Sequence, residues 1–471
     1  MGTIYNQSYL TLIAMTGSDA SYGLPGTQGR QRCPQWTGQT QGIYLLQEID
    51  DYSCLARESK WSSRGWTFQE SVLSPRILVF SDQGVFYQCH RKSHYKDEDH
   101  GDQRLDYPLT QIPLSSYDGL VSEFTTRDLT YKSDILDAFS GILHFAYGVE
   151  HHYGLPFSDF SRAILWRIRD GRYPMRPPCI PKRFPSWSWS SIDNIIQLPH
   201  PMLEQAKISA SLAQWVIPPR NKQLSLKILP NPSTEEHELD GDFDSDDPDS
   251  QGHLLARLAV LMAWKWGCFP GRLPKCLISG ATWEQYDAII RQRWKSLAGM
   301  TDEAYSMQGG HLPAHEQETR FPIQMQDACT DGCLMVFTQS TRLQIRENET
   351  FGNYTKLLDK YNDAVGWLIP NSINWEQLKK IPRWNWGAEF DVLALSIPYE
   401  GLNKYSRGVV YDHKAANWYD SAGNRLVTRD PCVNLMVVET KNGICRRIAL
   451  AQASLKSWIK RQPQFHTFIL D

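Results

Sequence analysis

The chain has 471 residues, which is long enough for two or three domains and a substantial core. Its 41% hydrophobic and 21% charged content is typical of a soluble globular protein, and a net charge of −3 gives no electrostatic reason to expect nucleic acid or an anionic membrane as a partner. Seventeen tryptophans are many for this length, and they indicate either sugar-stacking platforms or large anchors of a core or interface.

The first part of the chain predicts strands separated by turns. Residues 9–15 form an apolar run that is typical of a strand buried on both faces, as in a parallel sheet. Glycine-rich and proline-rich turn residues follow at 17–26, and a polar connection at 27–60 contains one further expected strand at 42–47.

Residues 61–76 carry the sharpest pattern in the chain. Ser62 and Ser63 are both good helix N-caps, and Pro75 prevents helical geometry at the residue before it, so we expect one helix that ends near Leu73. Beyond this helix, residues 77–80 form a short apolar run that predicts a second strand buried on both faces. A third strand is expected at 84–88.

Helical spacing places Trp66, Glu70 and Leu73 on one face of the expected helix. A glutamate on an apolar stripe has two interpretations. It either pairs with a cation such as Arg64 or Arg76, or it is a partly desolvated carboxylate at the mouth of a cleft. The spacing alone does not decide between them.

The middle of the chain predicts a layer of helices. Residues 116–148 show helical spacing in two segments, and Ser133 or Asp134 is the expected N-cap of the second. A further helix is expected at 158–170.

From residue 177 the pattern becomes that of strands. Residues 184–191 alternate aromatic residues with serine, which predicts a strand with one buried face. Further strands are expected at 207–216, 223–229, 254–264, 333–337, 343–346, 390–397, 433–439 and 444–450. The alternation favours a β-sandwich or open barrel, interrupted by a helix at 283–297 and a helical turn at 375–378. Nine acidic residues between 235 and 249 indicate an acidic, solvated loop at 233–252.

The ten cysteines are scattered, and no secretory signal precedes them, so we expect reduced thiols and a cytoplasmic protein. Cys329 and Cys333 form the one closely spaced pair. A zinc site would need a second pair nearby, and the sequence offers none, so no metal is expected.

The stretch Arg-Gly-Trp-Thr-Phe-Gln-Glu at 64–70, with Leu-Ser-Pro-Arg at 73–76 and Cys89 after the third strand, resembles the fungal heterokaryon incompatibility (HET) domain. Other segments are also similar to proteins of that family. These segments are 127–130, 134–142, 163–166, 185–189, 433–439 and 467–470. The resemblance implies an α+β protein with a partial HET domain at 1–95, a helical segment at 96–176 and a β-rich domain at 177–471.

The HET domain resembles TIR domains, which are flavodoxin-like α/β modules, and some of those cleave NAD⁺ through a glutamate in a Trp-x-x-x-Glu helix. The resemblance therefore implies Glu70 as the catalytic carboxylate and Arg64, Trp66 and Gln69 as binding residues. NAD⁺ is then a substrate, and no cofactor is implied. One carboxylate can stabilise the positive ribosyl centre that forms as neutral nicotinamide leaves.

The chain departs from the family pattern at its start. HET domains open with two strands, one like Ala-Leu-Ser-Tyr-x-Trp-Gly and one like Tyr-Leu-Trp-Ile-Asp-x-Leu-Cys-Ile, and neither occurs here. Because loops after such strands complete a TIR-type pocket, we expect this chain to be a truncated HET domain without catalytic activity.

The resemblance implies a signalling or interaction module of fungal nonself recognition and programmed cell death. Its partners would be proteins of incompatibility signalling, with a homo-oligomer as a further alternative, and neither nucleic acid nor membrane. NAD⁺ cleavage is the alternative function. A carbohydrate-binding protein built on tryptophans such as Trp187 is the third.

Overall fold

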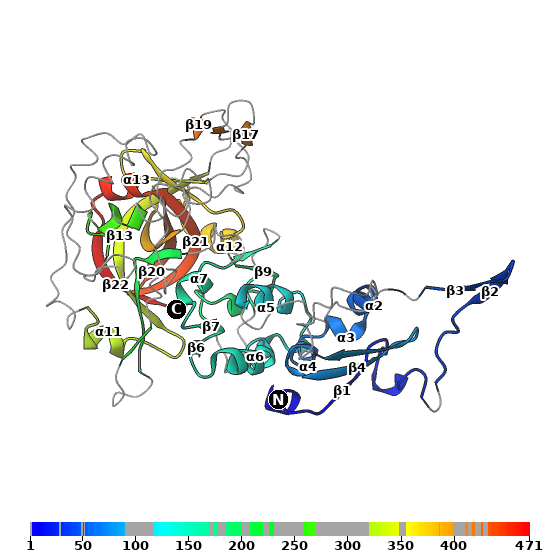
Figure 1. Cartoon of the computed structure of the whole chain (residues 1–471). Coiled ribbons are helices and arrows are strands. Elements are labelled where there is room, and N and C mark those ends of the chain that lie inside the picture. Colours follow the sequence, from blue (N-terminus) through cyan, green and yellow to red (C-terminus); the bar gives the residue numbers. More distant parts are fainter. Residues whose placement is uncertain are drawn as a thin grey trace, which may run out of the picture. The chain divides into compact units, whose positions relative to one another are not determined.

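The computed structural model divides the chain into two compact units (Figure 1). Unit 1 comprises Met1–Pro156, Arg176–Lys182 and Asn194–Ile196, and unit 2 comprises Phe157–Met175, Arg183–Asp193 and Gln197–Asp471. The expected three-part division at residues 95 and 176 stays a prediction.

The structure describes most of both units. The described residues are 2–27, 30–48, 50, 52–89, 116–169, 174–176, 184–198, 208–219, 226–229, 259–260, 262–264, 266–269, 320–347, 355–385, 387–398, 410–412, 417–419, 425–426 and 432–471. The acidic loop expected at 233–252 and the helix expected at 283–297 lie outside them.

Unit 1 contains short helices and short strands. Its described elements are α1 (Gly2–Asn6), β1 (Thr11–Ala14), η1 (Ala20–Tyr22), β2 (Thr37–Thr40), β3 (Ile43–Leu46), α2 (Tyr52–Glu58), α3 (Lys60–Ser63), α4 (Thr67–Leu73), β4 (Arg76–Phe80), β5 (Val85–Cys89), α5 (Tyr117–Phe124), η3 (Lys132–Asp134), α6 (Asp137–Tyr147), β6 (His151–His152) and β7 (Leu155–Pro156).

The central sheet of unit 1 has the strand order β1-β4-β5, with β1 parallel to β4 and β5 antiparallel to it. One face is buried, where Ile13 and Val79 pack with Trp61 of α3. The other face is partly open, since Leu12 is 55% and Tyr87 56% exposed. The prediction that residues 9–15 and 77–80 are buried on both faces is therefore wrong. In β1 and β4, buried residues alternate with more exposed ones because, among the described residues, helices α2 and α3 pack on one face of this sheet.

The single helix expected across residues 62–73 is two helices. Ser59, and neither Ser62 nor Ser63, caps α3, since its hydroxyl accepts from the N–H of Ser62 at 3.1 Å. Arg64 leaves helical geometry with φ −84° and ψ 133°, and α4 then runs to Leu73, where the end was correctly predicted.

Helices α4, α5 and α6 meet through a cluster of three phenylalanines. The ring of Phe124 lies 4.8 Å from that of Phe139 and 5.7 Å from that of Phe68, measured between centroids. The two predicted helices of residues 116–148 are thereby confirmed. Neither Ser133 nor Asp134 caps the second one, because both lie in the 3₁₀ turn η3 and α6 begins after Leu136.

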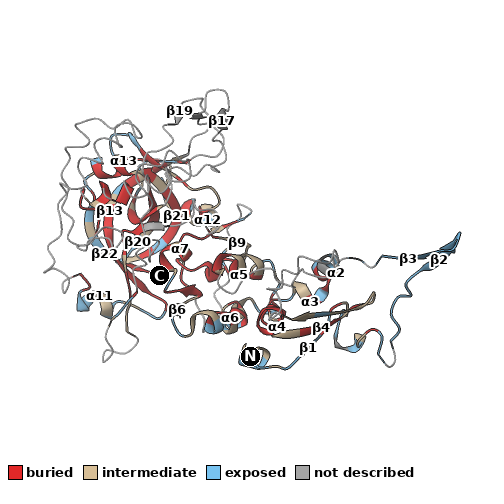
Figure 2. Ribbon diagram, in the orientation of Figure 1, coloured by how far each residue is buried: buried red, intermediate tan, exposed pale blue. Residues whose placement is uncertain are grey.

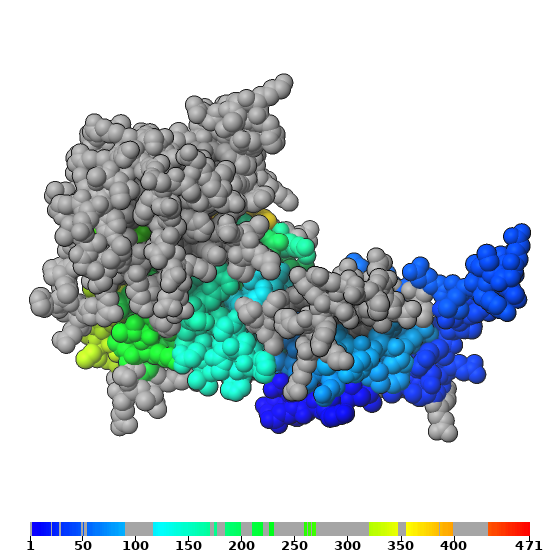
Figure 3. Space-filling view, viewed as in Figure 1, coloured from blue at the N-terminus to red at the C-terminus, as the bar shows by residue number. Residues whose placement is uncertain are grey.

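Among the residues that the structure describes, strands β2 and β3 pair only with each other and form an antiparallel hairpin. Every residue in it is exposed, including the apolar run Ile43–Leu46 (Figure 2). The space-filling view shows the hairpin as a projection of unit 1 (Figure 3). The strand expected at 42–47 is confirmed, and its partner β2 was not predicted.

Unit 2 is dominated by strands. Its described elements are α7 (Phe160–Ala163), β8 (Arg167–Ile168), η4 (Trp189–Ser191), β10 (Ile208–Ser211), β11 (Gln214–Ile217), β12 (Lys227–Ile228), α11 (Ile323–Asp327), β13 (Leu334–Glu347), β14 (Thr355–Leu358), β15 (Ala364–Leu368), α12 (Trp375–Leu378), β16 (Glu389–Pro398), β17 (Val410–Asp412), β18 (Asn417–Tyr419), β19 (Arg425–Leu426), β20 (Cys432–Lys441), β21 (Ile444–Ser454), α13 (Leu455–Lys460) and β22 (Gln464–Leu470). The short strand β9 (Ile196–Gln197) spans the boundary between the residue ranges of the two units.

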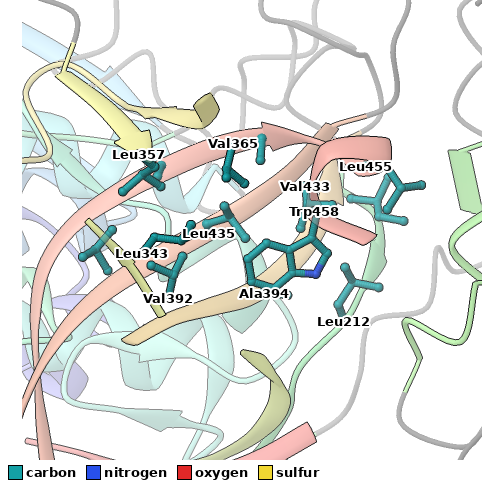
Figure 4. Close-up of a cluster of buried hydrophobic side chains, with 14 of the residues drawn as sticks. Leu212, Leu343, Leu357, Val365, Val392, Ala394, Val433, Leu435, Leu455 and Trp458 are labelled. Carbon is teal, nitrogen blue, oxygen red and sulfur yellow. The ribbon is translucent and has the colours of Figure 1, made fainter. Parts of the chain in front are cut away.

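The main sheet of unit 2 has ten strands among the described residues, and its pairings return to their starting point. Strand β13 pairs with β16, and the ladder continues through β20, β21, β15 and β14 back to β13. Side chains from these strands pack around Trp458 of α13 (Figure 4). The prediction of a β-rich C-terminal region in an α+β protein is confirmed, and the closed path replaces the open barrel or sandwich.

Three local predictions in unit 2 are wrong. The helix expected at 158–170 is shortened to α7, after which the chain turns into β8. The described residues among 259–264 are helical, although a strand was expected there. Residues 184–191 form a turn and the 3₁₀ helix η4, because the hydroxyl of Ser188 accepts from the N–H of Ser190 at 3.1 Å and caps it. The alternation of aromatic residues and serine thus came from local capping, and not from a sheet.

Candidate functional site

Glu70 lies half-buried in α4 and holds two helices together. Its Oε1 accepts a hydrogen bond of 3.0 Å from the hydroxyl of Tyr5 in α1, and its Oε2 accepts one of 3.0 Å from the indole Nε1 of Trp61 in α3. Both donors are neutral. Among the described residues no cation lies within ion-pair distance of this carboxylate, so pairing with Arg64 or Arg76 is not what holds it.

The electrostatics of the site are visible at Tyr5. Burial raises the pKa of this phenol to about 12, the charge of Glu70 and the hydrogen bond to it act in the same direction, and the charge of Arg64 opposes them. The phenol therefore keeps its proton at neutral pH and remains a donor to Glu70.

Two glycines set the position of α1. A Cβ on Gly2 would lie 2.7 Å from the Cα of Gly141 in α6, and a Cβ on Gly141 would lie 2.9 Å from the Cα of Gly2. The absence of both side chains lets the backbones of α1 and α6 approach closely. This approach brings the hydroxyl of Tyr5 over Glu70.

Gln69 points to α6. It is 1% exposed, and its Nε2 donates to the carbonyl oxygens of Ala138 at 2.8 Å and Asp137 at 3.3 Å. Its Oε1 occupies the space that a Cβ on Gly141 would fill, at 2.0 Å from that position. Neighbouring residues of α4 therefore have different tasks, because Gln69 anchors α6 while Glu70 binds α1 and α3.

A chain of hydroxyl groups ties the end of α1 to the end of α4. The hydroxyl of Ser8 donates to the carbonyl oxygen of Tyr5 at 2.8 Å and lies 3.0 Å from the hydroxyl of Thr11. That hydroxyl in turn lies 2.8 Å from the hydroxyl of the buried Ser74. Helix α1 is thus fixed against α4 at two places, here and at Glu70.

The link between α3 and α4 is fixed by residues far along the chain. The N–H of Gly65 donates to the carbonyl oxygen of Asp128 at 2.7 Å, and the N–H of Asp128 donates to the carbonyl oxygen of Ser63 at 2.6 Å. A Cβ on Gly65 would lie 2.6 Å from the Cδ2 of Leu129, so glycine is required for this approach. The segment around residue 128 holds the two helices in register.

Arg127 contributes to the same junction. Its guanidinium lies 4.7 Å from the centroid of the Phe68 ring, and its Nη1 donates to the hydroxyl of Thr67 at 3.4 Å. The side chain is 4% exposed and forms an ion pair of 3.5 Å with Glu123. A cation packed on the first turn of α4 further restricts where Glu70 lies.

The four predicted site residues do not converge. Glu70 faces α1 and α3, Gln69 is buried against α6, Trp66 is half-buried at the N-cap position of α4, and Arg64 is exposed. Arg64 acts on the site through its charge on Tyr5. Binding roles for these residues stay predictions.

Sequence reasoning missed the two donors of Glu70. Trp61 was available as the first residue of the stretch 61–76, and a buried indole usually needs an acceptor. Tyr5 lies 65 positions from Glu70 in the sequence, and its contact depends on the packing of α1 on α6, which no spacing rule predicts.

Two other observations concern metal binding and carbohydrate binding. Within the ranges described above, no group of three or more histidine, cysteine, aspartate or glutamate side chains could hold a metal ion. Trp187, which the carbohydrate-binding alternative would use, is 0% exposed, and its indole donates to the carbonyl oxygen of Gly332 at 3.0 Å.

Among the described helices, none combines the length and the apolar character that crossing a membrane requires.

Comparison with known proteins gives one match. Residues 1–70 match the model of the family described as heterokaryon incompatibility protein (HET). No curated protein and no solved structure matches the chain. The matched segment contains α1 and α3 and ends at Glu70, so it includes all three groups of the Tyr5–Glu70–Trp61 arrangement. The N-terminal 70 residues therefore carry the heterokaryon incompatibility match, consistent with a HET-domain protein.

Proposed function

We propose that the chain acts in fungal nonself recognition and programmed cell death as a signalling or interaction module. The observation that carries this proposal is the heterokaryon incompatibility match over residues 1–70. The flavodoxin-like, TIR-like assignment of this part belongs to the same proposal, and the parallel pair β1–β4 with α2 and α3 on one face supports it.

Contacts from beyond the matched segment tie that segment to the rest of unit 1. Asp128 and Leu129 lie outside residues 1–70, yet they fix Gly65 through the backbone and through close packing. Gly141 likewise receives Gln69. The matched residues and the helices that follow them thus form one packed unit, so a change at Gly141 alters the arrangement around Glu70 without touching its carboxylate.

The proposal is tested by inducing the full chain in a filamentous fungus and counting dead hyphal compartments with a vital dye. We expect induction to arrest growth and to raise the number of dead compartments several-fold. Gly141→Val places a branched side chain against Gln69 and Gly2 and should abolish the effect.

The matched control is Ile323→Ser, which alters a 74% exposed side chain in unit 2 and should kill as well as the wild type. The proposal would be contradicted if hyphae that express the wild-type chain, as verified by immunoblot, grew like the empty-vector strain. If Gly141→Val killed as many compartments as the wild type, the packing of unit 1 around Gly141 would not be needed for cell death.

A second candidate function is NAD⁺ cleavage with Glu70 as the catalytic carboxylate. The supporting observation is that two neutral donors orient Glu70 while, among the described residues, no cation pairs with it. Unlike a cation, neutral donors leave the negative charge of a carboxylate uncompensated. That charge could stabilise the positive ribosyl centre as nicotinamide leaves.

In this candidate, Tyr5 and Trp61 are positioning residues. The hydroxyl of Tyr5 and the indole N–H of Trp61 both donate to Glu70, so these groups fix the carboxylate and are not available to the substrate. Arg64 is exposed and Trp66 is half-buried, so both could contact NAD⁺ from this part of unit 1. Gln69 would act through α6, since its amide is buried there.

The second candidate is tested by incubating the protein with NAD⁺ and measuring free nicotinamide. If Glu70 carries the chemistry, Glu70→Gln abolishes release, while Glu58→Gln, an exposed glutamate of α2, retains it. Equal release by wild type and Glu70→Gln would exclude the role of Glu70. No release by the wild type would remove the activity from this chain, as the sequence expectation of an inactive domain requires.

A further inference from the structure

Cys329 and Cys333 lie at the two ends of the turn that joins α11 to β13 in unit 2. Cys329 is half-exposed, whereas Cys333 is 1% exposed and belongs to a small apolar cluster with Met335 and Ile469. The site therefore has one sulfur that solvent reaches and one that protein surrounds.

The turn directs donors at the buried sulfur. The N–H of Thr330 lies 3.2 Å from the Sγ of Cys333, and the Oγ1 of the same threonine lies 3.4 Å from it. The N–H of Cys333 donates back to the carbonyl oxygen of Thr330 at 3.1 Å. Gly332 has φ +92°, a left-handed conformation that favours glycine and lets the chain reverse within five residues.

The outer sulfur has a different environment. The Sγ of Cys329 lies 3.3 Å from the carbonyl oxygen of Met325 and also shares a hydrogen bond with the Sγ of Cys333, so its one proton faces two acceptors. That shared hydrogen bond, together with the donors from Thr330, lowers the pKa of Cys333 to about 6 despite its burial. The same shared bond and partial burial raise the pKa of Cys329.

The turn is held in place from outside. The indole Nε1 of Trp187 donates to the carbonyl oxygen of Gly332 at 3.0 Å, and Leu334, the next residue after Cys333, pairs with Leu470 in β22. The Cys333 end of the turn is therefore held in place on both sides of its sulfur.

We propose that Cys329 and Cys333 form an oxidation site that hydrogen peroxide converts into an intrachain disulfide. The observation behind it is a pair of hydrogen-bonded sulfurs, one accessible to a small oxidant and one held as the nucleophile for the second step. The proposal is independent of the function assigned to unit 1.

The chemistry balances in two steps. The Sγ of Cys329 attacks the O–O bond of the peroxide while its proton passes to the thiolate of Cys333, which gives a sulfenic acid at Cys329 and hydroxide. The hydroxide takes the proton from Cys333. The resulting thiolate of Cys333 attacks the sulfur of Cys329 and expels the second hydroxide. Starting from the Cys329 thiol and the Cys333 thiolate, one peroxide therefore yields the disulfide, one water and one hydroxide.

The other described cysteines lack one of these features. Cys268 and Cys445 are buried, at 0% and 1% exposed, so both are less accessible to peroxide than Cys329. Cys33 and Cys54 are exposed and serve as internal controls for simple accessibility.

The experiment treats the full chain with hydrogen peroxide, blocks the remaining thiols with iodoacetamide and maps the peptides by mass spectrometry. We expect the peptide that contains both Cys329 and Cys333 to lose two hydrogens and to become resistant to alkylation. The rate of this change should be at least ten times the rate at which Cys33 is oxidised. Dithiothreitol should restore both thiols.

Single variants distinguish a disulfide from separate oxidations. In Cys333→Ser, Cys329 should lose the resolving thiol and accumulate sulfenic or sulfinic acid, which a dimedone probe detects. In Cys329→Ser, oxidation at residue 333 should slow at least ten-fold because the accessible sulfur is gone. Circular dichroism checks that both variants fold.

The proposal is overturned if Cys33 is oxidised as fast as the pair in the wild type. It is also overturned if the pair accumulates sulfinic acids without a cross-link. The wild-type measurement needs no variant, so a misfolded substitution would not leave the proposal undecided.

Discussion

Similar apolar strands are buried to very different extents in the sheets of the two units. In unit 2, residues 432–438 of β20 are all buried, and β16 is buried from Val392 to Ile397. In unit 1, Leu12 of β1 is 55% exposed, and Ile43–Leu46 of β3 is exposed throughout. Figure 2 shows this contrast between the red strands of one unit and the pale strands of the other.

The difference shows that an apolar run predicts a strand but does not predict its burial. Strand β20 has paired neighbours on both sides and core side chains packed on it, while β3 has one partner, β2. Burial depends on what the remainder of the chain places on each face. The sheet of unit 2 thus contributes to one large buried cluster, whereas the sheet of unit 1 keeps a partly open face.

The largest effect should come from emptying the core of unit 2. Trp458 is 0% exposed, and its indole donates to the Oε1 of Gln339 at 3.2 Å. Trp458→Ala should lower the free energy of unfolding of this unit by about 3–5 kcal/mol, because it leaves a cavity and removes the indole that donates to the Oε1 of Gln339. Urea unfolding measures the change.

The control for this variant is Tyr361→Ala, at a side chain that is 71% exposed, which should cost less than about 0.5 kcal/mol. If Trp458→Ala cost less than about 1 kcal/mol, unit 2 would not depend on a packed interior.

The next effect tests close packing in unit 1. Alanine normally stabilises a helix interior relative to glycine by about 1 kcal/mol. In α6 the sign should reverse, since a Cβ on Gly141 lies 2.0 Å from the Oε1 of Gln69. Gly141→Ala should therefore destabilise unit 1 by about 1–3 kcal/mol, measured by hydrogen exchange of the α4 and α6 amides.

Ser140→Ala is the matched control, because Ser140 is the exposed neighbour on the same helix and should change stability by less than about 0.5 kcal/mol. A Gly141→Ala protein that is more stable than the wild type would show that α1 and α6 do not approach as described.

The hydrogen bond of Tyr5 should give a smaller, pH-dependent effect. Because its pKa is raised to about 12 in the folded chain, the unfolded chain loses the phenolic proton first as pH rises. The stabilising contribution is complete below about pH 10 and is lost as pH rises toward about 12. The difference in urea midpoint between wild type and Tyr5→Phe should therefore shrink over that window.

Tyr131→Phe is the control, since this phenol belongs to a residue that is 69% exposed, and its urea midpoint should follow the wild type. A difference between wild type and Tyr5→Phe that stays constant from pH 9 to pH 12 would contradict the assignment.

Several features of the fold were predictable from residues that act locally. Pro75 ends α4 at Leu73 as expected, and the helical spacing of 116–148 gives α5 and α6. The strands expected at 390–397, 433–439 and 444–450 correspond to β16, β20 and β21, because continuous apolar runs there are buried in a large sheet.

Features that depend on distant residues were not predictable. The break between α3 and α4 follows from hydrogen bonds between the backbone of Asp128 and that of Ser63 and Gly65. Asp128 lies more than sixty residues away from both in the sequence. Candidate residue Glu70 was found from its motif, but its partner Tyr5 required the packing of two glycines. Gln69 was expected near a ligand and is instead bonded to α6.

The smallest effect should come from the hairpin of unit 1. Tyr44 and Leu45 are 81% and 55% exposed, so Tyr44→Ser and Leu45→Ser should each change stability by less than about 0.5 kcal/mol. The same kind of change at the buried Val437 of β20 should cost several times more. A loss above about 1.5 kcal/mol at Leu45 would show that the hairpin is covered and would remove the contrast between the two units.

The central claim is that Glu70 is held between α1 and α3 by Tyr5 and Trp61, and a double-mutant cycle tests it most directly. Tyr5→Phe, Glu70→Ala and the double variant are compared by hydrogen exchange of the α1 and α4 amides at neutral pH. The account predicts a coupling free energy between Tyr5 and Glu70 of about 0.5–1.5 kcal/mol, because each single change removes the same hydrogen bond. Effects that add to within about 0.3 kcal/mol would contradict it.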